Sequence, residues 1–189
     1  MERRAEFYAA DHGRDRIKFF CSFFYTILFE WDGLDNGIQR IMRWLMKKGP
    51  QEARRDPLAY YSKWIIPVNM HNYHWSLMVV RIATQEIEFY DSIPDLAEAT
   101  QRMAHTLAFV KVLAAETQHD VSKWQEWKCE LKASPQQDDG FDCGLFVIVN
   151  AELEALGIPF NADSYCHGEI RAQNIRMKVA CEILKYPPK

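Results

Sequence analysis

Cys143 is the cysteine whose surroundings best fit a nucleophile. It stands between a polar loop that contains Gly140 and an apolar stretch that covers residues 143–156. If that stretch is a helix, its first turn offers unpaired N–H groups and the positive end of the helix dipole, and these favour a thiolate. Gly144 follows directly and lets the chain approach a substrate closely. On this residue alone, a buried helix cysteine without chemistry remains an alternative.

A thiolate nucleophile requires a base, and the base requires an acceptor that orients it. Of the six histidines, His74 stands at the start of a β-prone stretch, and Asp91 follows the next such stretch. If the two stretches pair as a hairpin, His74 and Asp91 face each other across its open end. Asp91 then accepts a hydrogen bond from one imidazole nitrogen while the other nitrogen faces Cys143.

These two residues also have simpler interpretations. His71 and His74 form an H-x-x-H pair that suits a metal, but a structural zinc site needs more well-spaced Cys or His residues than the chain offers. Asp91 alone reads as a residue of a turn at a strand end. We therefore predict no metal and no cofactor.

Gln137 is the candidate donor for the oxyanion that an acyl transfer creates. It lies in the loop that leads to the nucleophile, so its side-chain amide can point at the reacting carbonyl together with the backbone N–H of Cys143. The alternative is a solvated loop glutamine, and the neighbouring Gln136 shows how little one glutamine means.

The elements that must position these residues are predicted from periodicity and turn signals. The pattern indicates an α+β fold, in which a small, mainly antiparallel sheet is packed with helices. Residues 17–29 fit a buried helix or an extended core element, residues 51–57 read as a polar loop, and Pro67 suggests a sheet edge or a bulge. Strands are predicted over 64–68, 75–82, 87–90 and 127–131, and helices from about 36 to 48 and over 96–115, 143–156 and 169–184. Asp95 or Ser92 is expected to start the second helix, and Gly157 to close the third.

Composition limits the classes to which the protein can belong. With 189 residues, 48% of them hydrophobic, and a formal net charge of −3, the chain predicts one ordinary globular domain. The absence of a large basic block argues against nucleic acid as the main partner. No stretch reads as a membrane span or a secretory signal, so we expect an intracellular protein.

The five cysteines predict a reduced protein rather than a disulfide framework. Their number is odd and no C-x-x-C pair occurs, which also argues against a zinc ribbon. We expect Cys143 to differ from the others, which read as mostly buried packing thiols. Those others are Cys21, Cys129, Cys166 and Cys181.

In combination these residues resemble a known family. The motifs that carry the resemblance are His74-Trp75, Tyr90-Asp91-Ser92, Gln137 and Asp142-Cys143-Gly144. In this order and with these spacings they are similar to the ubiquitin-like-protein-specific cysteine proteases, the Ulp/SENP family of SUMO proteases. The likeness covers about residues 19–184, nearly the whole chain.

The resemblance implies a papain-like cysteine protease that cleaves after the C-terminal Gly-Gly of a ubiquitin-like modifier, with SUMO as the expected partner. The catalytic residues would be His74, Asp91, Cys143 and Gln137. Substrate would be bound by Trp75, Asp142 and Gly144, with the Trp75 ring covering a narrow tunnel that only two glycines can thread. The family further implies a nuclear or cytoplasmic location, and we expect a monomer from the size of the domain.

One departure from the family lies at the N-terminus. The family usually begins its protease domain with a Trp-Leu-x-Asp segment, but residues 1–18 contain no tryptophan and the first one is Trp31. We therefore divide the chain into an N-terminal segment, 1–18, and a catalytic domain, 19–189, and leave the preferred modifier open. Two other functions remain as alternatives, an acetyltransferase of similar fold and a catalytically silent modifier-binding domain.

Overall fold

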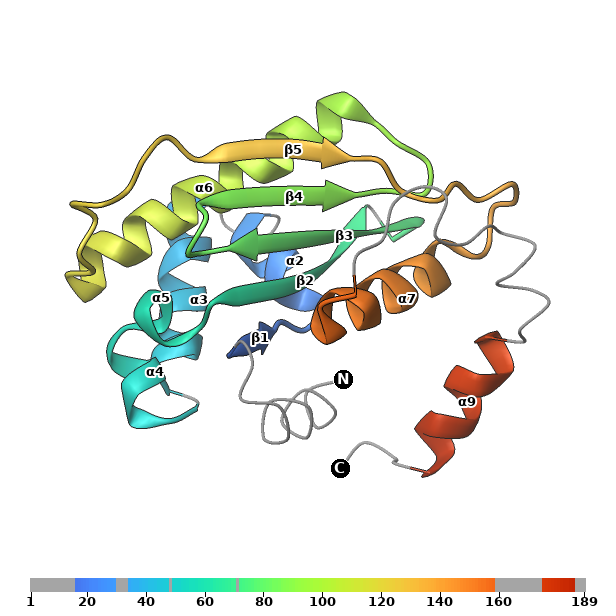
Figure 1. Cartoon of the computed structure of the whole chain (residues 1–189), viewed down its shortest axis with the longest axis horizontal. Coiled ribbons are helices and arrows are strands. Elements are labelled where there is room, and N and C mark those ends of the chain that lie inside the picture. The colour runs from blue at the N-terminus through green and yellow to red at the C-terminus, as the bar shows by residue number, and fades with distance from the viewer. Residues whose placement is uncertain (1–15, 30–33, 48, 71, 159–174, 186–189) are drawn as a thin grey trace.

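A five-stranded sheet forms the centre of the fold (Figure 1). The computed structural model describes residues 16–29, 34–47, 49–70, 72–158 and 175–185. The strands follow one another across the sheet in sequence order. They are β1 (Ile17–Phe19), β2 (Lys63–Met70), β3 (His74–Arg81), β4 (Glu86–Tyr90) and β5 (Lys128–Lys132).

The sheet is antiparallel at its centre and parallel at its margins. β3 pairs antiparallel with β2 and with β4, whereas β1 and β5 add to the margins in parallel. A parallel pair needs a crossover connection, and α6 (Leu96–Thr117) supplies it between β4 and β5. The predicted α+β class, a small sheet packed with helices, is confirmed.

The predicted hairpin of β3 and β4 is also confirmed. Its register pairs Leu77 with Tyr90 at one end and Arg81 with Glu86 at the turn. Pro67 lies in β2 where β1 has already ended, because β1 pairs only as far as Ile65. β2 is thus a local edge at Pro67, as predicted, and the missing N–H is tolerated there.

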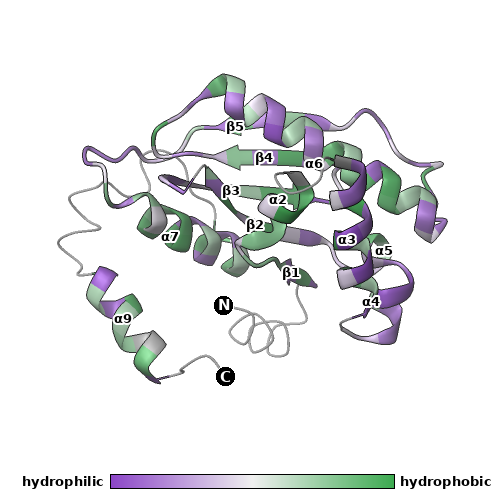
Figure 2. Ribbon diagram, turned by 180° about the vertical axis from the view of Figure 1, so that it is seen from behind, coloured by the Kyte–Doolittle hydropathy of each residue, from purple (hydrophilic) through white to green (hydrophobic). Residues whose placement is uncertain are grey.

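Helices cover the two faces of the sheet unequally (Figure 1). On one face lie α2 (Phe23–Phe29), α3 (Leu34–Lys47) and α6, around a core that contains the fully buried Trp64. On the other face α7 (Cys143–Leu156) is the only helix among the described residues that packs on the sheet, and its Val147 and Ala151 share an apolar cluster with Leu77 and Val79. Figure 2 shows the hydrophobic colour along the middle of β3, where Leu77, Met78, Val79 and Val80 are fully buried, as expected of a strand covered on both faces.

Residues 51–57 are not a loop as predicted. They form α4 (Gln51–Arg55) and the first residue of α5 (Pro57–Tyr60). Asp56 starts α5, since its carboxylate accepts hydrogen bonds from the N–H groups of Leu58 and Ala59, each at 3.0 Å. The charged composition concealed a local signal, an Asp at the N-cap followed by Pro at the first helical position.

Other predicted helix boundaries agree with the structure. Asp95 caps α6 by accepting from Ala97 N and Glu98 N, and Gly157 ends α7 with a φ of 65°. α9 (Ile175–Lys185) covers the later part of the helix predicted over 169–184, while residues 169–174 lie outside the described residues. None of the described helices is long and apolar enough to cross a membrane.

The expectation of mostly buried cysteines is wrong. Cys21, Cys129 and Cys181 are exposed, and Cys166 lies outside the described residues. Cys21 follows the short β1, Cys129 lies on the marginal strand β5, and Cys181 lies on α9, so none of them faces the core. Cys143 is buried, with 6% of its surface exposed.

Candidate active site

The residues predicted to do chemistry gather at one end of the sheet, on the right in Figure 1. β3 begins at His74, β4 ends directly before Asp91, and α7 begins at Cys143. The hairpin carries the histidine and the aspartate, and the helix on the adjoining face carries the cysteine.

His74 and Asp91 are joined by a short hydrogen bond. Nε2 of His74 lies 2.6 Å from Oδ1 of Asp91, and these residues are buried, with 8% and 2% exposed. Continuing the hairpin register places Asp91 opposite Ser76, so the contact to His74 is diagonal across the strands. Oδ1 of Asp91 also accepts from the N–H of Ile93 at 2.9 Å, which fixes the carboxylate from a second side.

This contact determines which imidazole nitrogen is left for the thiol. With Nε2 on Asp91, Nδ1 of His74 has no hydrogen-bond partner among the described residues. The second carboxylate oxygen of Asp91, Oδ2, is buried and has no partner among them either. A buried carboxylate with few other donors orients the ring and stabilises the imidazolium that forms when His74 accepts a proton.

Cys143 is the first residue of α7, as predicted from the polar-to-apolar boundary. Asp142 precedes it at the N-cap, but its side chain makes no capping hydrogen bond. The backbone carbonyl of Asp142 instead accepts from Leu145 N at 2.8 Å and Phe146 N at 3.1 Å. The N–H groups of Cys143 and Gly144 are therefore left without a hydrogen-bond partner among the described residues, and such groups can bind an oxyanion.

Trp75 and Gly144, the residues after His74 and Cys143, connect the two elements. A β-carbon added at Gly144 would lie 4.0 Å from Cδ1 of Trp75. Trp75 is partly buried and packs against the cluster that includes Leu77 and Val147. The start of β3 and the start of α7 are thus held against each other at the predicted site.

Gln137 is held firmly by hydrogen bonds. Its Oε1 accepts from Ser92 Oγ at 2.6 Å, and its Nε2 donates to the carbonyl of Asp139 at 2.6 Å. Its backbone N–H also donates to the carbonyl of Ser92 at 3.2 Å. These bonds attach the loop before Cys143 to the chain after Asp91 and leave the second hydrogen of the Gln137 amide group for another acceptor.

The sequence interpretation missed three supports of this loop. Gln136, which was set aside as uninformative, donates to the carbonyl of Asp91 at 3.1 Å. Oδ1 of Asp139 accepts from Phe141 N at 2.9 Å and from Asp142 N at 3.1 Å, an arrangement that the Asp-Asp-Gly run signals. Ser92 was considered as a helix start and as part of the Tyr90-Asp91-Ser92 motif, but not as a partner of Gln137.

Arg176 on α9 makes an ion pair with Asp142 beside the nucleophile. Its guanidinium also donates to the carbonyl of Phe141 at 3.5 Å. Asp142 is buried although most of the Arg176 side chain is exposed. No sequence pattern linked these positions, because the pair depends on where α9 lies.

The described residues contain no cluster of three or more His, Cys, Asp or Glu side chains that suits a metal ion. His71, the other histidine of the H-x-x-H pair, lies outside the described part of the chain. His74 directs one of its nitrogens to Asp91.

Comparison with known proteins places the chain in a family. The profile of the Ulp1 protease family, C-terminal catalytic domain, matches residues 1–187. Ubiquitin-like-specific protease 1A of Arabidopsis thaliana is 31% identical over 178 residues, which cover 90% of this chain and 32% of that protein. Ubiquitin-like-specific protease 1 of Saccharomyces cerevisiae is 28% identical over 144 residues, which cover 76% of this chain and 21% of that protein. The chain thus spans a third or less of the length of these relatives.

Solved structures share the fold. The catalytic domain of the Chaetomium thermophilum Ulp1-like SUMO protease superimposes with a TM-score of 0.66 at 24% identity, covering 91% of this chain and 64% of that one. The C-terminal Ulp1 protease domain in complex with Smt3, the yeast ortholog of SUMO, gives 0.63 at 24% identity, with 85% and 68% covered. The resemblance seen in the His-Trp, Asp and Asp-Cys-Gly motifs is therefore confirmed, and the chain belongs to the Ulp1 protease family.

Proposed function

We propose that this chain is a cysteine protease that cleaves after the C-terminal Gly-Gly of a ubiquitin-like modifier, with SUMO as the favoured modifier. The observation that carries the proposal is the 2.6 Å contact of His74 with Asp91 at the sheet end where α7 begins with Cys143. The names of the relatives and the Smt3 complex of the Ulp1 domain support the choice of substrate.

The first half of the reaction forms a thioester. His74 takes the proton from Sγ of Cys143, and the thiolate attacks the carbonyl carbon of the terminal glycine. The carbonyl π electrons move to the oxygen, which the N–H of Cys143 and the Gln137 amide stabilise. When this intermediate collapses, the C–N bond breaks and His74 gives its proton to the leaving amine, while Asp91 holds the ring.

The second half releases the modifier. His74 removes a proton from water, and the oxygen attacks the thioester carbon. The C–S bond breaks, and the Cys143 thiolate is regenerated with His74 protonated. The modifier leaves with a free C-terminal carboxyl group, which loses its proton to the solvent.

Trp75 and Gly144 explain the preference for glycine in this proposal. They approach each other at the start of β3 and of α7, so a tail that passes there has little space for side chains. Asp142 completes the substrate-binding set, with Arg176 holding its carboxylate.

The proposal also covers the organisation of the chain. Residues 19–189 form the catalytic domain and 1–18 a segment before it, although β1 already begins at Ile17. The enzyme needs no cofactor, acts as a monomer and binds no nucleic acid or membrane. It works in the nucleus or the cytoplasm.

A panel of modifiers tests activity and specificity together. SUMO, a Nedd-type modifier and ubiquitin, each ending in Gly-vinyl sulfone, are incubated with the chain and with Cys143→Ala, and adducts are located by peptide mass spectrometry. We expect an adduct on Cys143 with SUMO and none in the variant. Acetylation of Cys143 by acetyl-CoA without any modifier adduct would show an acetyltransferase instead. Binding of modifiers without an adduct would show a silent binding domain.

A further inference from the structure

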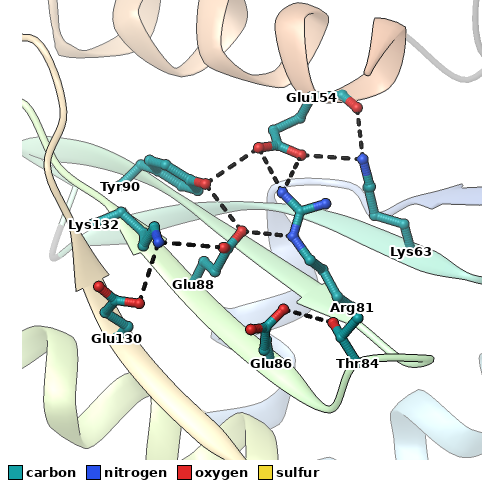
Figure 3. Close-up of polar contacts among 9 residues, drawn as sticks. All are labelled: Lys63, Arg81, Thr84, Glu86, Glu88, Tyr90, Glu130, Lys132 and Glu154. Atoms are coloured by element: carbon teal, nitrogen blue, oxygen red, sulfur yellow. Dashed lines mark hydrogen bonds and ion pairs between the residues drawn. The ribbon is translucent and has the colours of Figure 1, made fainter. Parts of the chain in front are cut away.

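A cluster of charged side chains lies between α7 and the sheet, on the face opposite the larger core (Figure 3). Its members come from four strands and one helix, and most are buried between them. They are Lys63, Arg81, Glu88, Tyr90, Lys132 and Glu154.

Glu154 joins α7 to three adjacent strands. Its carboxylate accepts two hydrogen bonds from Arg81 of β3, at 2.9 and 2.8 Å, and one from Lys63 of β2 at 3.1 Å. The hydroxyl of Tyr90, the last residue of β4, is 3.2 Å away. Lys63 also donates to the backbone carbonyl of Glu154 at 2.8 Å, so the helix is held by its backbone as well.

Tyr90 connects this cluster to the catalytic strand end. It directly precedes Asp91, and its side chain belongs to the same apolar cluster as Val147 and Ala151 of α7. Its hydroxyl lies within hydrogen-bond distance of Glu88 at 3.0 Å and of Glu154. Burial, with the charges of Glu154 and Glu88, raises the pKa of Tyr90 above its usual value, so the hydroxyl keeps its proton at any working pH.

The charges in the cluster compensate one another. The carboxylates of Glu88 and Glu154 face the cations of Lys63 and Arg81. Lys132 is a third and more exposed cation, 3.8 Å from Glu88. Burial opposes the charge on Arg81, but Glu154 and Glu88 more than offset it and raise its pKa above the ordinary value.

Such a cluster specifies geometry more than it adds stability. Apolar residues of similar volume hold a helix on a sheet at least as well, because charges lose hydration when they are buried. Apolar contacts tolerate sliding and rotation, whereas the planar Arg81 guanidinium bonds two carboxylates at once, Glu88 through Nε and Glu154 through Nη2, which restricts where Glu154 can lie. Both kinds of contact hold α7: Val147 and Ala151 belong to the apolar cluster, and the hydrogen bonds of Glu154 fix the orientation of the helix on the sheet.

We propose that Glu154 and Tyr90 are positioning residues that fix α7 against β3 and β4, and thereby set Cys143 relative to His74 and Asp91. The proposal rests on the proposed protease function. Glu154 lies roughly three helical turns after Cys143, and a rigid helix carries a shift at one end to the other. A misplacement of about 1 Å can cost ~10²-fold in rate.

Glu154→Gln and Tyr90→Phe test the proposal, and Glu130→Gln is the matched control. Glu154→Gln keeps the size of the side chain and one acceptor oxygen but loses the charge, and Tyr90→Phe loses only the hydroxyl. Glu130 lies at the margin of the cluster, exposed, and bonds Lys132 at 3.2 Å. For Glu154→Gln we expect kcat of modifier cleavage to fall by about 10- to 100-fold with KM unchanged. Tyr90→Phe should show a smaller loss of the same kind, and Glu130→Gln none.

A second readout does not need the modifier. Iodoacetamide alkylates Cys143, and its rate against pH reports how far His74 assists the thiol. Peptide mass spectrometry gives the rate at Cys143, with the exposed Cys21 as an internal reference in the same molecule. In Glu154→Gln and Tyr90→Phe the pH of half-maximal alkylation should move at Cys143 toward that of an ordinary thiol and stay constant at Cys21.

The outcomes separate positioning from a structural role. Folded Glu154→Gln with wild-type kcat and a wild-type Cys143 profile would overturn the proposal. If Glu154→Gln does not fold, Tyr90→Phe decides it by the same two readouts. If wild type reacts with no modifier, the protease function fails by itself, while the alkylation profile still tests whether the cluster positions Cys143.

Discussion

Cδ1 of Trp75 lies 4.0 Å from the point where a β-carbon would stand at Gly144. The two residues belong to elements far apart in the sequence, and each directly follows a residue predicted to be catalytic. A methyl group at Gly144 would therefore meet Trp75 at ordinary van der Waals distance in the free enzyme. The methyl group would therefore narrow the space between Trp75 and residue 144 through which a substrate tail would pass.

Gly144→Ala should consequently lower activity without lowering stability. Because the residue is helical and its Cβ fits, the free energy of unfolding should stay the same or rise by about 0.4–1 kcal/mol. Cleavage of a Gly-Gly substrate should fall, since the methyl group narrows the passage beside Trp75. Urea unfolding and steady-state kinetics measure the two effects.

Gly140→Ala is the control for that variant. A β-carbon at Gly140 meets nothing within 4 Å, and the residue lies near Gly144, in the loop before Cys143. Its activity should be close to wild type. An equal loss of activity in the two variants would show that loop rigidity, and not the Trp75 passage, limits cleavage.

Asp91→Asn should preserve the fold and lower kcat by about 10²–10⁴-fold. The amide keeps an oxygen to accept from Ile93 N but lacks the charge that stabilises the imidazolium of His74. Rates of modifier cleavage, together with near-UV circular dichroism, provide the measurement. A folded Asp91→Asn enzyme with a wild-type rate would remove Asp91 from the mechanism.

Ser92→Ala should lower kcat through Gln137. The serine hydroxyl donates to Gln137 Oε1 at 2.6 Å, and without it the amide loses one of its two side-chain anchors. Gln137→Ala should cost more, about 10²–10³-fold, because it removes a candidate oxyanion donor entirely. In a double-mutant cycle, Ser92→Ala should have little further effect once Gln137 is alanine. Full additivity would mean that Ser92 acts independently of Gln137.

The free energy of unfolding should fall in acid partly because of His105. Burial, and then the charge of Arg102, lowers the pKa of His105 below its ordinary value, and Nδ1 lies 3.1 Å from the hydroxyl of Tyr25. Between the lowered pKa and the unfolded value of about 6.5, the unfolded chain binds more protons than the folded one. The contribution of His105 to the free energy of unfolding should therefore be complete above the unfolded pKa of about 6.5. It should decrease as the pH falls below this unfolded pKa.

His105→Asn measures this contribution. Its side-chain oxygen takes a position near that of Nδ1 and can accept from Tyr25, but it does not titrate. Urea unfolding of wild type and variant from about pH 7.5 to about 5.5 should give a flatter profile for the variant. Parallel profiles would show that His105 contributes nothing to the acid loss.

The catalytic end of the sheet could be predicted from sequence because its signals are local. The hairpin of β3 and β4 follows from two β-prone stretches and a short turn, and it brings His74 to Asp91. The polar loop followed by an apolar run gives the start of α7 at Cys143. Each of these needs only neighbouring residues and a known period.

The features that the sequence did not predict depend on contacts between distant segments. The parallel pairing of β5 with β4 depends on the path that α6 takes. Glu154 reads as a surface residue of an apolar helix until α7 lies over Arg81 and Lys63. Cys129 is exposed on the marginal strand β5 and Cys21 just after the marginal strand β1, whereas residue type alone favoured burial.

Cleavage of a SUMO–Gly-Gly–X fusion by Cys143→Ala tests the central claim most directly. Cys129→Ala serves as the control, because Cys129 is an exposed residue on the marginal strand β5. We expect Cys143→Ala to remain folded and to release no free SUMO, while Cys129→Ala cleaves at the wild-type rate. Undiminished cleavage by folded Cys143→Ala would contradict the assignment of Cys143 as the nucleophile.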